Sequence, residues 1–248
     1  MCYTVKQLKE KALKRARHHG IKEDIIHYEN ELRQFSDYHA ISGFAHPQLI
    51  IYTNAEPFRP VLSYWGLIPH WVKTEAQANQ LRDKTLNARI ETIFEKPSFK
   101  AAARTKHCLI PLDGFYEYHH YKGKSYPFYI SSHNASPLLL AGLWSLWINK
   151  HTGEVINSCS IVTTRANALM TKIHNNPKIK EARMPLVLSP EKADQWLQGT
   201  EAQNRSKLTS FDKTLTLNAH TVKPLIGKKA VGNTAAASAP YPYEALIF

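Results

Sequence analysis

The sequence has little cysteine and no long hydrophobic run. Its three cysteines are an odd, widely spaced set among 248 residues, which excludes a disulfide framework and a C-x-x-C metal site. The longest apolar run, Pro137–Ile148, contains a serine and falls short of the roughly 20 residues that a membrane span needs. No apolar segment follows the lysine-rich N-terminus, so it is not a secretory signal. We therefore expect a cytoplasmic protein with no metal, cofactor or membrane partner.

Acidic residues are also scarce relative to basic ones. Lysine and arginine total 32 against 20 aspartate and glutamate residues, which gives a net charge of +12. An excess of this size favours polyanionic partners, and nucleic acid is the commonest of these in the cytosol. The alternative from charge alone is a soluble basic protein without such a partner, and the charge says nothing about base sequence.

Hydrophobic periodicity predicts one α+β domain over 1–233, followed by a loosely packed tail at 234–248 that is rich in Ala, Ser and Pro. Turns are predicted at Asp113-Gly114 and at Lys122-Gly123-Lys124, the second within a hairpin. The predicted helices are 5–18, 23–35, 166–173, 191–197 and 200–208. The predicted strands, within the span from 49 to 187, are 49–52, 126–130, 138–141 and 160–164.

Cys2 is the most informative residue, because a side chain as small as cysteine normally permits removal of Met1. An N-terminal cysteine carries an amine of pKa ~8 beside a thiol of pKa ~8.5, and both have reactive forms near neutral pH. The pair can trap an aldehyde, first as an imine and then as a five-membered thiazolidine. The thiolate alone can instead act as a peptidase nucleophile. A chance cysteine at this position is the third interpretation.

Three other segments carry candidate chemistry. Asn87 and Arg89 place an amide and a guanidinium close to Glu91. Glu117 lies among aromatic residues, where partial desolvation would raise its pKa toward the range of a general acid or base; the alternative interpretation is a solvent-facing strand residue. His174 precedes Arg183-Met184-Pro185, although a single histidine among 13 is more often structural or exposed.

Several motifs occur in a specific order along the chain. They are Met1-Cys2, Trp65-Gly66-Leu67-Ile68-Pro69, Asn87-Ala88-Arg89 with Glu91, Asp113-Gly114 with Glu117, and Ile173-His174 before Arg183-Met184-Pro185. In this order they resemble the SOS response-associated peptidase (SRAP) family, from Cys2 to about Asn233. The resemblance implies a β-rich α+β fold with a barrel-like core, flanking helices and a basic groove.

The resemblance also implies an abasic-site sensor that shields damaged single-stranded DNA by a covalent thiazolidine crosslink. It assigns the crosslink to Cys2, the positioning of cysteine and sugar to Asn87, general acid/base catalysis to Glu117, and assistance with opening of the sugar ring to His174. The implied DNA contacts are Arg89, Arg183 and Thr163 to the backbone, with Trp71 as an aromatic wedge. A monomer in the bacterial cytoplasm, on the nucleoid after damage, would fit this role.

The chain departs from the family pattern at three places. Tyr3-Thr4-Val5 follows Cys2 where the family has Gly-Arg-Phe, so another residue must supply that arginine's phosphate contact. Ser42 stands where a wedge proline is usual, within the segment 38–43 that replaces the family's Asn-Val-Ala-Pro-Gly type of loop. Eight residues, Asn175 to Ala182, separate His174 from Arg183 in place of one, which puts the pairing of these two residues in doubt.

Two other functions remain open from the sequence. One is a cysteine-type peptidase or autopeptidase that acts through Cys2. The other is a non-covalent module for binding single-stranded DNA, which would use the basic groove without any reaction. Cys108 and Cys159 lie in apolar, strand-like segments, and we expect both to be core thiols.

Overall fold

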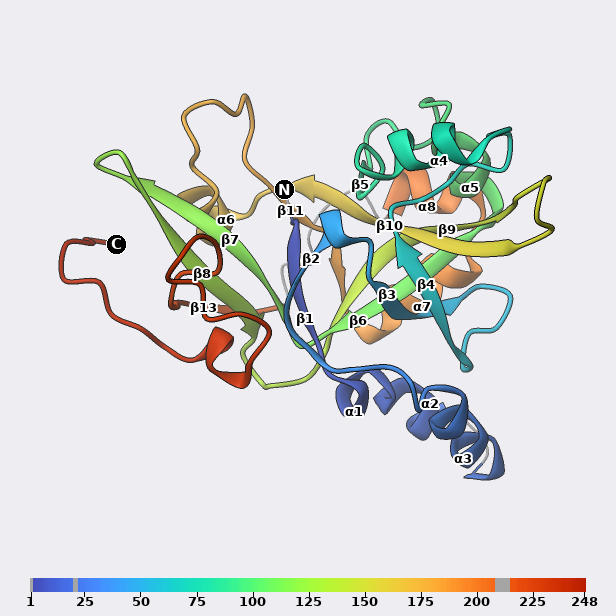
Figure 1. The fold of residues 1–248 in the computed structure, drawn as a ribbon, viewed down its shortest axis with the longest axis horizontal. Helices are drawn as coiled ribbons and strands as arrows, with labels where there is room; N and C mark the ends of the chain where they lie inside the picture. The colour runs from blue at the N-terminus through green and yellow to red at the C-terminus, as the bar shows by residue number, and fades with distance from the viewer. Residues whose placement is uncertain (1, 20–21, 208–214) are drawn as a thin grey trace.

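The computed structural model describes residues 2–19, 22–207 and 215–248. Its centre is a closed barrel of five strands, in which β9 pairs with both β6 and β10, and β10 pairs in parallel with β4 (Figure 1). The barrel strands are β3 (Gln48–Thr53), β4 (Pro60–Trp65), β6 (His107–Leu112), β9 (Leu138–Ile148) and β10 (Val155–Arg165). Three short strands extend this sheet: β5 (Asn87–Arg89), β11 (Arg183–Pro185) and β12 (Val187–Leu188). The predicted α+β fold with a barrel-like core is confirmed.

A second sheet packs beside the barrel, with the strand order β13-β8-β7-β1-β2. Its strands are β1 (Thr4–Gln7), β2 (Tyr38–Ser42), β7 (Gly114–Tyr121), β8 (Lys124–Ser132) and β13 (Leu217–Thr221). The chain passes from the barrel into this sheet at Asp113, whose Oδ2 accepts a hydrogen bond of 2.7 Å from the backbone N–H of Leu8. The predicted Asp113-Gly114 turn is therefore the crossing point between the two sheets. The four predicted strands all lie within observed strands.

The hairpin between β7 and β8 confirms the second predicted turn. Tyr121 pairs with Lys124, which leaves a two-residue loop. Lys122 and Gly123 have φ values of 47° and 74°. Positive φ at both loop residues is the requirement of a type I′ turn, whose twist matches that of the flanking strands.

The N-terminal segment corrects one prediction. Residues 5–18 do not form a single helix, because Val5 belongs to β1 and the helices α1 (Lys9–Ala12) and α2 (Lys14–His19) follow it. Alternate burial along β1 explains the difference: Val5 and Gln7 are fully buried. The Gln7 amide donates to the carbonyls of Ile50 at 2.9 Å and Pro111 at 2.8 Å, so this residue joins β1 to the barrel.

The other helices lie around the two sheets. The helix α3 (Lys22–Glu31) ends before the predicted Phe35, and α6 (Ala168–Ile173) and α7 (Pro190–Gln198) match their predictions closely. The helix α8 (Glu201–Lys207) matches as well, although Leu208 of that prediction lies outside the described residues. The remaining helical elements are α4 (Glu75–Arg82), α5 (Lys100–Thr105), and the 3₁₀ helices η1 (Gly43–Ala45) and η2 (Ala235–Ser238). Within the described ranges, no helix has the length and apolar character to cross a membrane.

The segment 234–248, which we expected to be loosely packed, makes specific contacts with the second sheet. Ala237 is fully buried, and Val222 forms a β-bridge with Pro240. At the C-terminus, the rings of Phe248 and Phe128 lie 4.7 Å apart between centroids. These contacts hold the last residues against β8 and β13.

Candidate functional site

The first residues of the chain are held between two sheets. In β1, Thr4 pairs with Tyr116 and Val5 with Phe115 of β7, and continuation of this antiparallel register brings Tyr3 opposite Glu117. From the barrel side, the Asn87 amide donates a hydrogen bond of 2.7 Å to the Cys2 carbonyl. Asn87 therefore fixes the backbone of the cysteine, while the Asn87 Oδ1 atom is buried without a hydrogen-bond partner.

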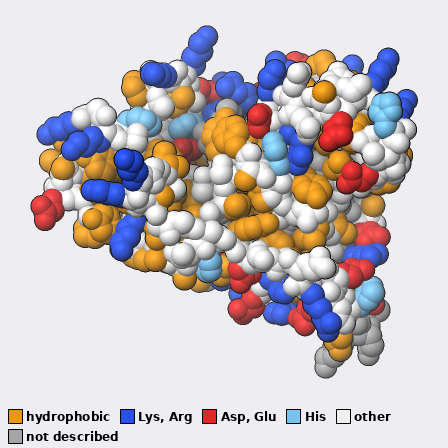
Figure 2. Space-filling model, in the orientation of Figure 1, with side chains coloured by type: hydrophobic (Ala, Val, Ile, Leu, Met, Phe, Trp, Pro, Cys, Tyr) orange, Lys and Arg blue, Asp and Glu red, His pale blue; other side chains and the backbone are white. Residues whose placement is uncertain are grey.

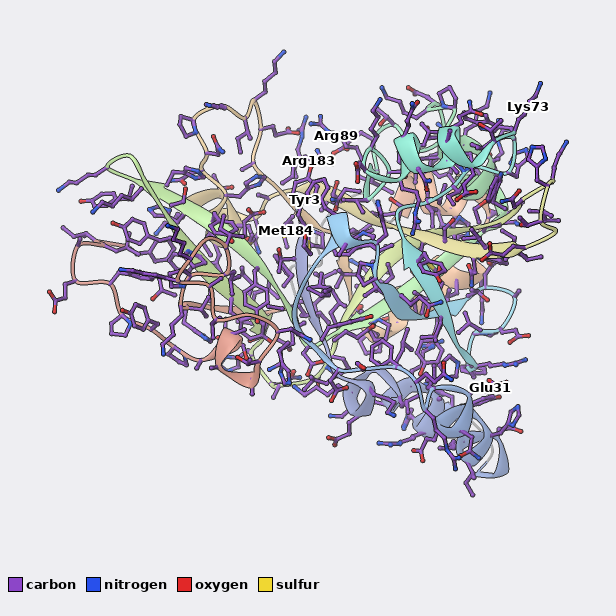
Figure 3. All side chains as sticks on the ribbon, in the orientation of Figure 1. Tyr3, Glu31, Lys73, Arg89, Arg183 and Met184 are labelled. Atoms are coloured by element: carbon purple, nitrogen blue, oxygen red, sulfur yellow. The ribbon has the colours of Figure 1, made fainter. Side chains whose placement is uncertain are left out.

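Three adjacent strands bring together residues that are far apart in the sequence. β5 pairs in parallel with β10, which places Arg89 beside Thr163. β11 pairs with the other edge of β10, which places Arg183 beside Arg165. The strand order β5-β10-β11 therefore aligns the Asn87 segment with the Arg183 segment, and Tyr3, Arg89 and Arg183 lie close together near the N-terminal end of β1 (Figure 3).

A cavity of about 510 Å³ opens over this junction. Its lining includes four of the eight predicted site residues, Arg89, Glu117, His174 and Arg183. Tyr3 also lines it, and the neighbouring Cys2 is fully buried directly before it in the chain. The other lining residues are Tyr118, His120, Ser125, Asn176, Ile179, Lys180, Glu181 and Ile226. On the face in Figure 2, Lys and Arg side chains gather along the upper edge and the left lobe.

Glu117 and His174 are both buried at this cavity. Glu117 is 7% exposed, so it takes the buried orientation of the two that the sequence allowed, and its Oε1 accepts a hydrogen bond from the Tyr118 N–H. His174 is 6% exposed and follows α6. Burial lowers the pKa of His174, while the nearby negative charge of Glu117 opposes that shift. The imidazole is therefore predominantly neutral at pH 7 and is able to accept a proton.

The eight-residue insertion does not separate His174 from Arg183. The His174 Nδ1 atom lies 2.9 Å from the Arg183 carbonyl oxygen and 3.0 Å from its backbone nitrogen. The insertion forms the loop between α6 and β11 in Figure 1, and Asn175 ties it to β7 through two hydrogen bonds with the His120 backbone, of 2.7 and 3.0 Å. Four inserted residues line the cavity: Asn176, Ile179, Lys180 and Glu181.

Arg183 and Thr163 lie deeper than surface phosphate contacts would. The Arg183 side chain is 2% exposed and forms ion pairs with Glu91 at 2.8 Å and with Glu181 at 3.0 Å. Thr163 is fully buried, and its carbonyl accepts a hydrogen bond of 2.9 Å from Arg183. Partial burial would raise the pKa of Glu91, but hydrogen bonds and positive charge from Arg183 lower it overall. In this arrangement Thr163 positions Arg183, and a phosphate would reach the guanidinium only by displacing a carboxylate.

Arg89 and Trp71 remain open to solvent. Arg89 is exposed at the end of β5 and lines the cavity. Trp71 lies between β4 and α4, is 40% exposed, and donates a hydrogen bond of 3.2 Å to the Pro97 carbonyl. Trp71 is not one of the residues that line the cavity. Its predicted role as a wedge would therefore concern DNA bases outside the cavity.

The Cys2 thiol is held in its neutral form. Burial raises the pKa of this thiol strongly, and the negative charge of Glu117 raises it further. Cys108 and Cys159 are also fully buried, as expected of core thiols, and burial raises the pKa of both. Among the described residues, no group of three or more His, Cys, Asp or Glu side chains could hold a metal ion.

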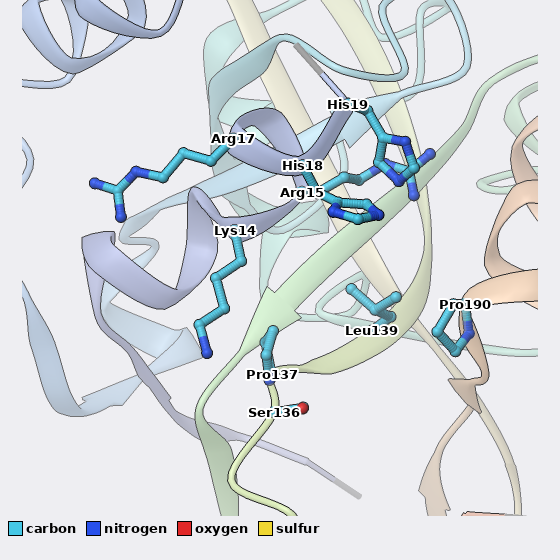
Figure 4. Close-up of a pocket in the computed structure, with 9 residues that line it drawn as sticks. All are labelled: Lys14, Arg15, Arg17, His18, His19, Ser136, Pro137, Leu139 and Pro190. Carbon is cyan, nitrogen blue, oxygen red and sulfur yellow. The ribbon is translucent and has the colours of Figure 1, made fainter. Parts of the chain in front are cut away.

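A separate cavity of about 580 Å³ lies beside α2 (Figure 4). Its basic lining residues are Lys14, Arg15, Arg17, His18 and His19. Pro137, Leu139 and Pro190 supply its apolar lining, and none of the predicted site residues belongs to it. Arg15 is engaged there by Asp194 at 2.7 Å. This cavity shares no lining residue with the one at the N-terminal end of β1.

The profile of the SOS response associated peptidase (SRAP) family matches residues 1–229. The chain belongs to the SRAP family. Among similar solved structures, a crystal structure of a protein from Bacteroides thetaiotaomicron has a TM-score of 0.83 and 31% identity, over 97% of this chain and 100% of that one. Another, from Bordetella bronchiseptica, has a TM-score of 0.69 at 24% identity, over 90% and 100%, and supports the fold alone.

Curated relatives are similar in sequence to this chain over part of their length. Abasic site processing protein YoqW of Bacillus subtilis is 39% identical over 134 residues, which are 54% of each protein. Abasic site processing protein HMCES of Rattus norvegicus is 29% identical over 204 residues, which are 71% of this chain and 55% of that protein. The alignments thus span about half the length of the curated relatives.

Sequence reasoning missed two contributors to the site. Glu181 lies within the insertion and forms an ion pair with Arg183. The only sequence signal for this pair was the acidic residue two positions before the arginine. Tyr3, which follows Cys2, lines the cavity, with its ring 5.1 Å from that of Phe44. The cavity therefore has an aromatic wall beside Cys2.

Proposed function

We propose that this SRAP protein captures abasic sites in single-stranded DNA through a thiazolidine on Cys2, formed after removal of Met1. The observation that carries the proposal is the position of Cys2. Asn87 holds the Cys2 carbonyl, and the adjacent cavity contains Glu117 and His174. The names of the abasic site processing relatives give the substrate class.

The reaction joins the Cys2 amine and thiol to one carbon of the lesion. The open-chain abasic sugar presents an aldehyde at C1′, and attack by the amine gives a carbinolamine that loses water to form an imine. The sulfur then adds to the imine carbon, and the thiol proton is transferred to the nitrogen. The product carries C–N and C–S bonds in place of the C=O bond, with one water released and no oxidant or reductant used.

The buried residues Glu117 and His174 catalyse the proton transfers that the reaction needs. An abasic sugar is mostly a closed hemiacetal, so its ring opening requires proton transfer to and from oxygen. A neutral His174 accepts the hydroxyl proton, and Glu117 exchanges protons with the amine and the carbinolamine oxygen. Arg89, exposed at the same cavity, holds a flanking phosphate without reading a base.

The strongly raised thiol pKa argues against a peptidase as the main activity. A cysteine peptidase depends on a thiolate at neutral pH, and such thiols have lowered pKa values. Burial and Glu117 shift the pKa of Cys2 in the opposite direction. In the capture reaction the amine attacks first, and the thiol can bring its own proton to the imine.

A denaturing gel separates the candidate functions. The protein is incubated with a single-stranded oligonucleotide that carries one abasic site, and Cys2→Ala serves as the matched variant. A covalent band with the parent and none with Cys2→Ala supports capture. Reversible binding without a covalent band indicates a non-covalent module, and cleavage of peptides without DNA indicates a peptidase.

A further inference from the structure

A second cavity adjoins the candidate reactive cavity. Its volume is about 540 Å³, within the range of small-ligand pockets. Tyr118, Ser125 and Ile226 line both cavities, so the two adjoin at these residues. The proposed chemistry uses none of the residues that line the second cavity alone, which include Lys124, Tyr126, Tyr243, Glu244 and Ala245.

The walls of this second cavity are aromatic and apolar, and they are fixed in place. Tyr126 at the start of β8 packs edge-on against Tyr243, with ring centroids 5.0 Å apart. The Tyr243 hydroxyl donates a hydrogen bond of 2.8 Å to the Val222 carbonyl, which anchors the C-terminal segment as one wall. Lys124, exposed at the hairpin, adds a positive charge at the rim, and Glu244, also exposed, adds a negative one. Aromatic walls suit the stacking of a nucleobase, and Lys124 is available to contact its phosphate.

Ile226 marks the boundary between the two cavities. It is 73% exposed although it is a large apolar side chain, and it lines both cavities. Apolar side chains of this kind can be inserted between neighbouring nucleotides by proteins that separate bases. An abasic nucleotide leaves a gap in the base stack, and an exposed apolar side chain such as Ile226 has the chemistry to fill such a gap.

We propose that the second cavity binds the nucleobase next to the abasic site, on one side of the lesion, with Ile226 between the two nucleotides. This inference rests on the proposed function, since it takes the first cavity as the place of the abasic sugar. Recognition would be by stacking, which accepts any base. The lesion would therefore be recognised by the combination of a missing base and a stacked neighbour.

The test uses three short single-stranded oligonucleotides with a central tetrahydrofuran, a stable abasic analogue that cannot crosslink. One has both neighbouring bases, and the others lack the base on the 5′ or the 3′ side. Affinity is measured by fluorescence anisotropy, and crosslinking rates are measured in parallel with natural abasic sites. Ile226→Ser removes the dividing side chain, and Ala245→Trp fills the cavity from an exposed position. Ile148→Ser is the matched control, because Ile148 is 58% exposed and lines neither cavity.

We expect the parent protein to bind about tenfold more weakly when the base on one side is missing, within the range of base–aromatic stacking, and to tolerate loss of the other base. Ile226→Ser and Ala245→Trp should abolish this difference, whereas Ile148→Ser should keep it. Equal affinity of the parent for all three oligonucleotides would overturn the inference, as would an unchanged difference in both cavity variants. Absence of crosslinking would refute the proposed function instead, because the affinity measurement does not depend on a reaction.

Discussion

Replacement of Arg183 by alanine should reduce stability, because this arginine is an internal ion-pair residue in the structure. Its guanidinium is 2% exposed and contacts Glu91, Glu181 and the Thr163 carbonyl. Breaking a fully buried pair costs about 3–5 kcal/mol. Glu91 and Glu181 are 41% and 37% exposed, so water can solvate both carboxylates in the variant. We therefore expect a smaller loss, about 2–3 kcal/mol in the free energy of unfolding.

Thermal denaturation followed by circular dichroism measures this loss. For a domain of this size, 1 kcal/mol shifts Tm by roughly 2–4 °C, so Arg183→Ala should unfold about 4–12 °C below the parent. The matched control is Arg165→Ala, because Arg165 also pairs with Glu181, at 2.9 Å, but is 78% exposed. Its loss should stay within about 1 kcal/mol. If Arg183→Ala kept the parent Tm and lost only DNA affinity, Arg183 would be a surface phosphate ligand and the internal role would be wrong.

Three further predictions concern binding, catalysis and pH. Arg89→Ala should weaken binding to all single-stranded sequences alike and reduce the salt slope of log K by about 0.7. The control Arg17→Ala, at the cavity beside α2, should leave abasic-DNA binding unchanged. A change in sequence preference in Arg89→Ala would contradict the phosphate contact. Glu117→Gln should slow capture by about 10²–10⁴-fold in a gel time course without weakening DNA binding. An open-chain aldehyde analogue should not restore the rate, because Glu117 acts on the amine and the carbinolamine, after ring opening; parent-like rates on natural abasic sites would remove Glu117 from the mechanism. Burial lowers the pKa of His174, so the unfolded chain binds a proton at this imidazole more readily than the folded protein does. Urea denaturation should therefore show stability falling as pH drops below about 6.5, and His174→Gln should flatten this dependence on pH. An identical pH dependence in the variant would refute the burial of a neutral His174.

Local sequence signals predicted the elements that depend on neighbouring residues. Gly123 predicted a hairpin turn because glycine tolerates positive φ, and both Lys122 and Gly123 adopt positive φ in the turn. The N-terminal strand was missed because Val5, Leu8, Ala12 and Ala16 have helical spacing. The contacts that make residues 4–7 a strand come from β2 and β7, more than 30 positions away in the chain. Pairing of that range cannot be read from a local pattern.

In the candidate site, too, the sequence predicted residue chemistry but not the contacts that depend on long-range packing. Candidate residues were identifiable by chemistry and by the order of motifs, and the structure brings Arg89, Glu117, His174 and Arg183 to one cavity. Which of them faces solvent depends on tertiary packing. The pairing of β10 with both β5 and β11 brings Glu91 to Arg183, and tertiary packing also sets the contacts of Arg183 with Glu181 and His174.

The intact mass of the crosslinked species tests the central claim most directly. The parent protein is incubated with an abasic oligonucleotide of known mass, and the covalent product is weighed by mass spectrometry beside Cys2→Ala. The thiazolidine mechanism predicts the mass of the protein without Met1 plus the oligonucleotide, less one water, and no product with Cys2→Ala. A covalent product that retains Met1, or an equal yield from Cys2→Ala, would contradict it.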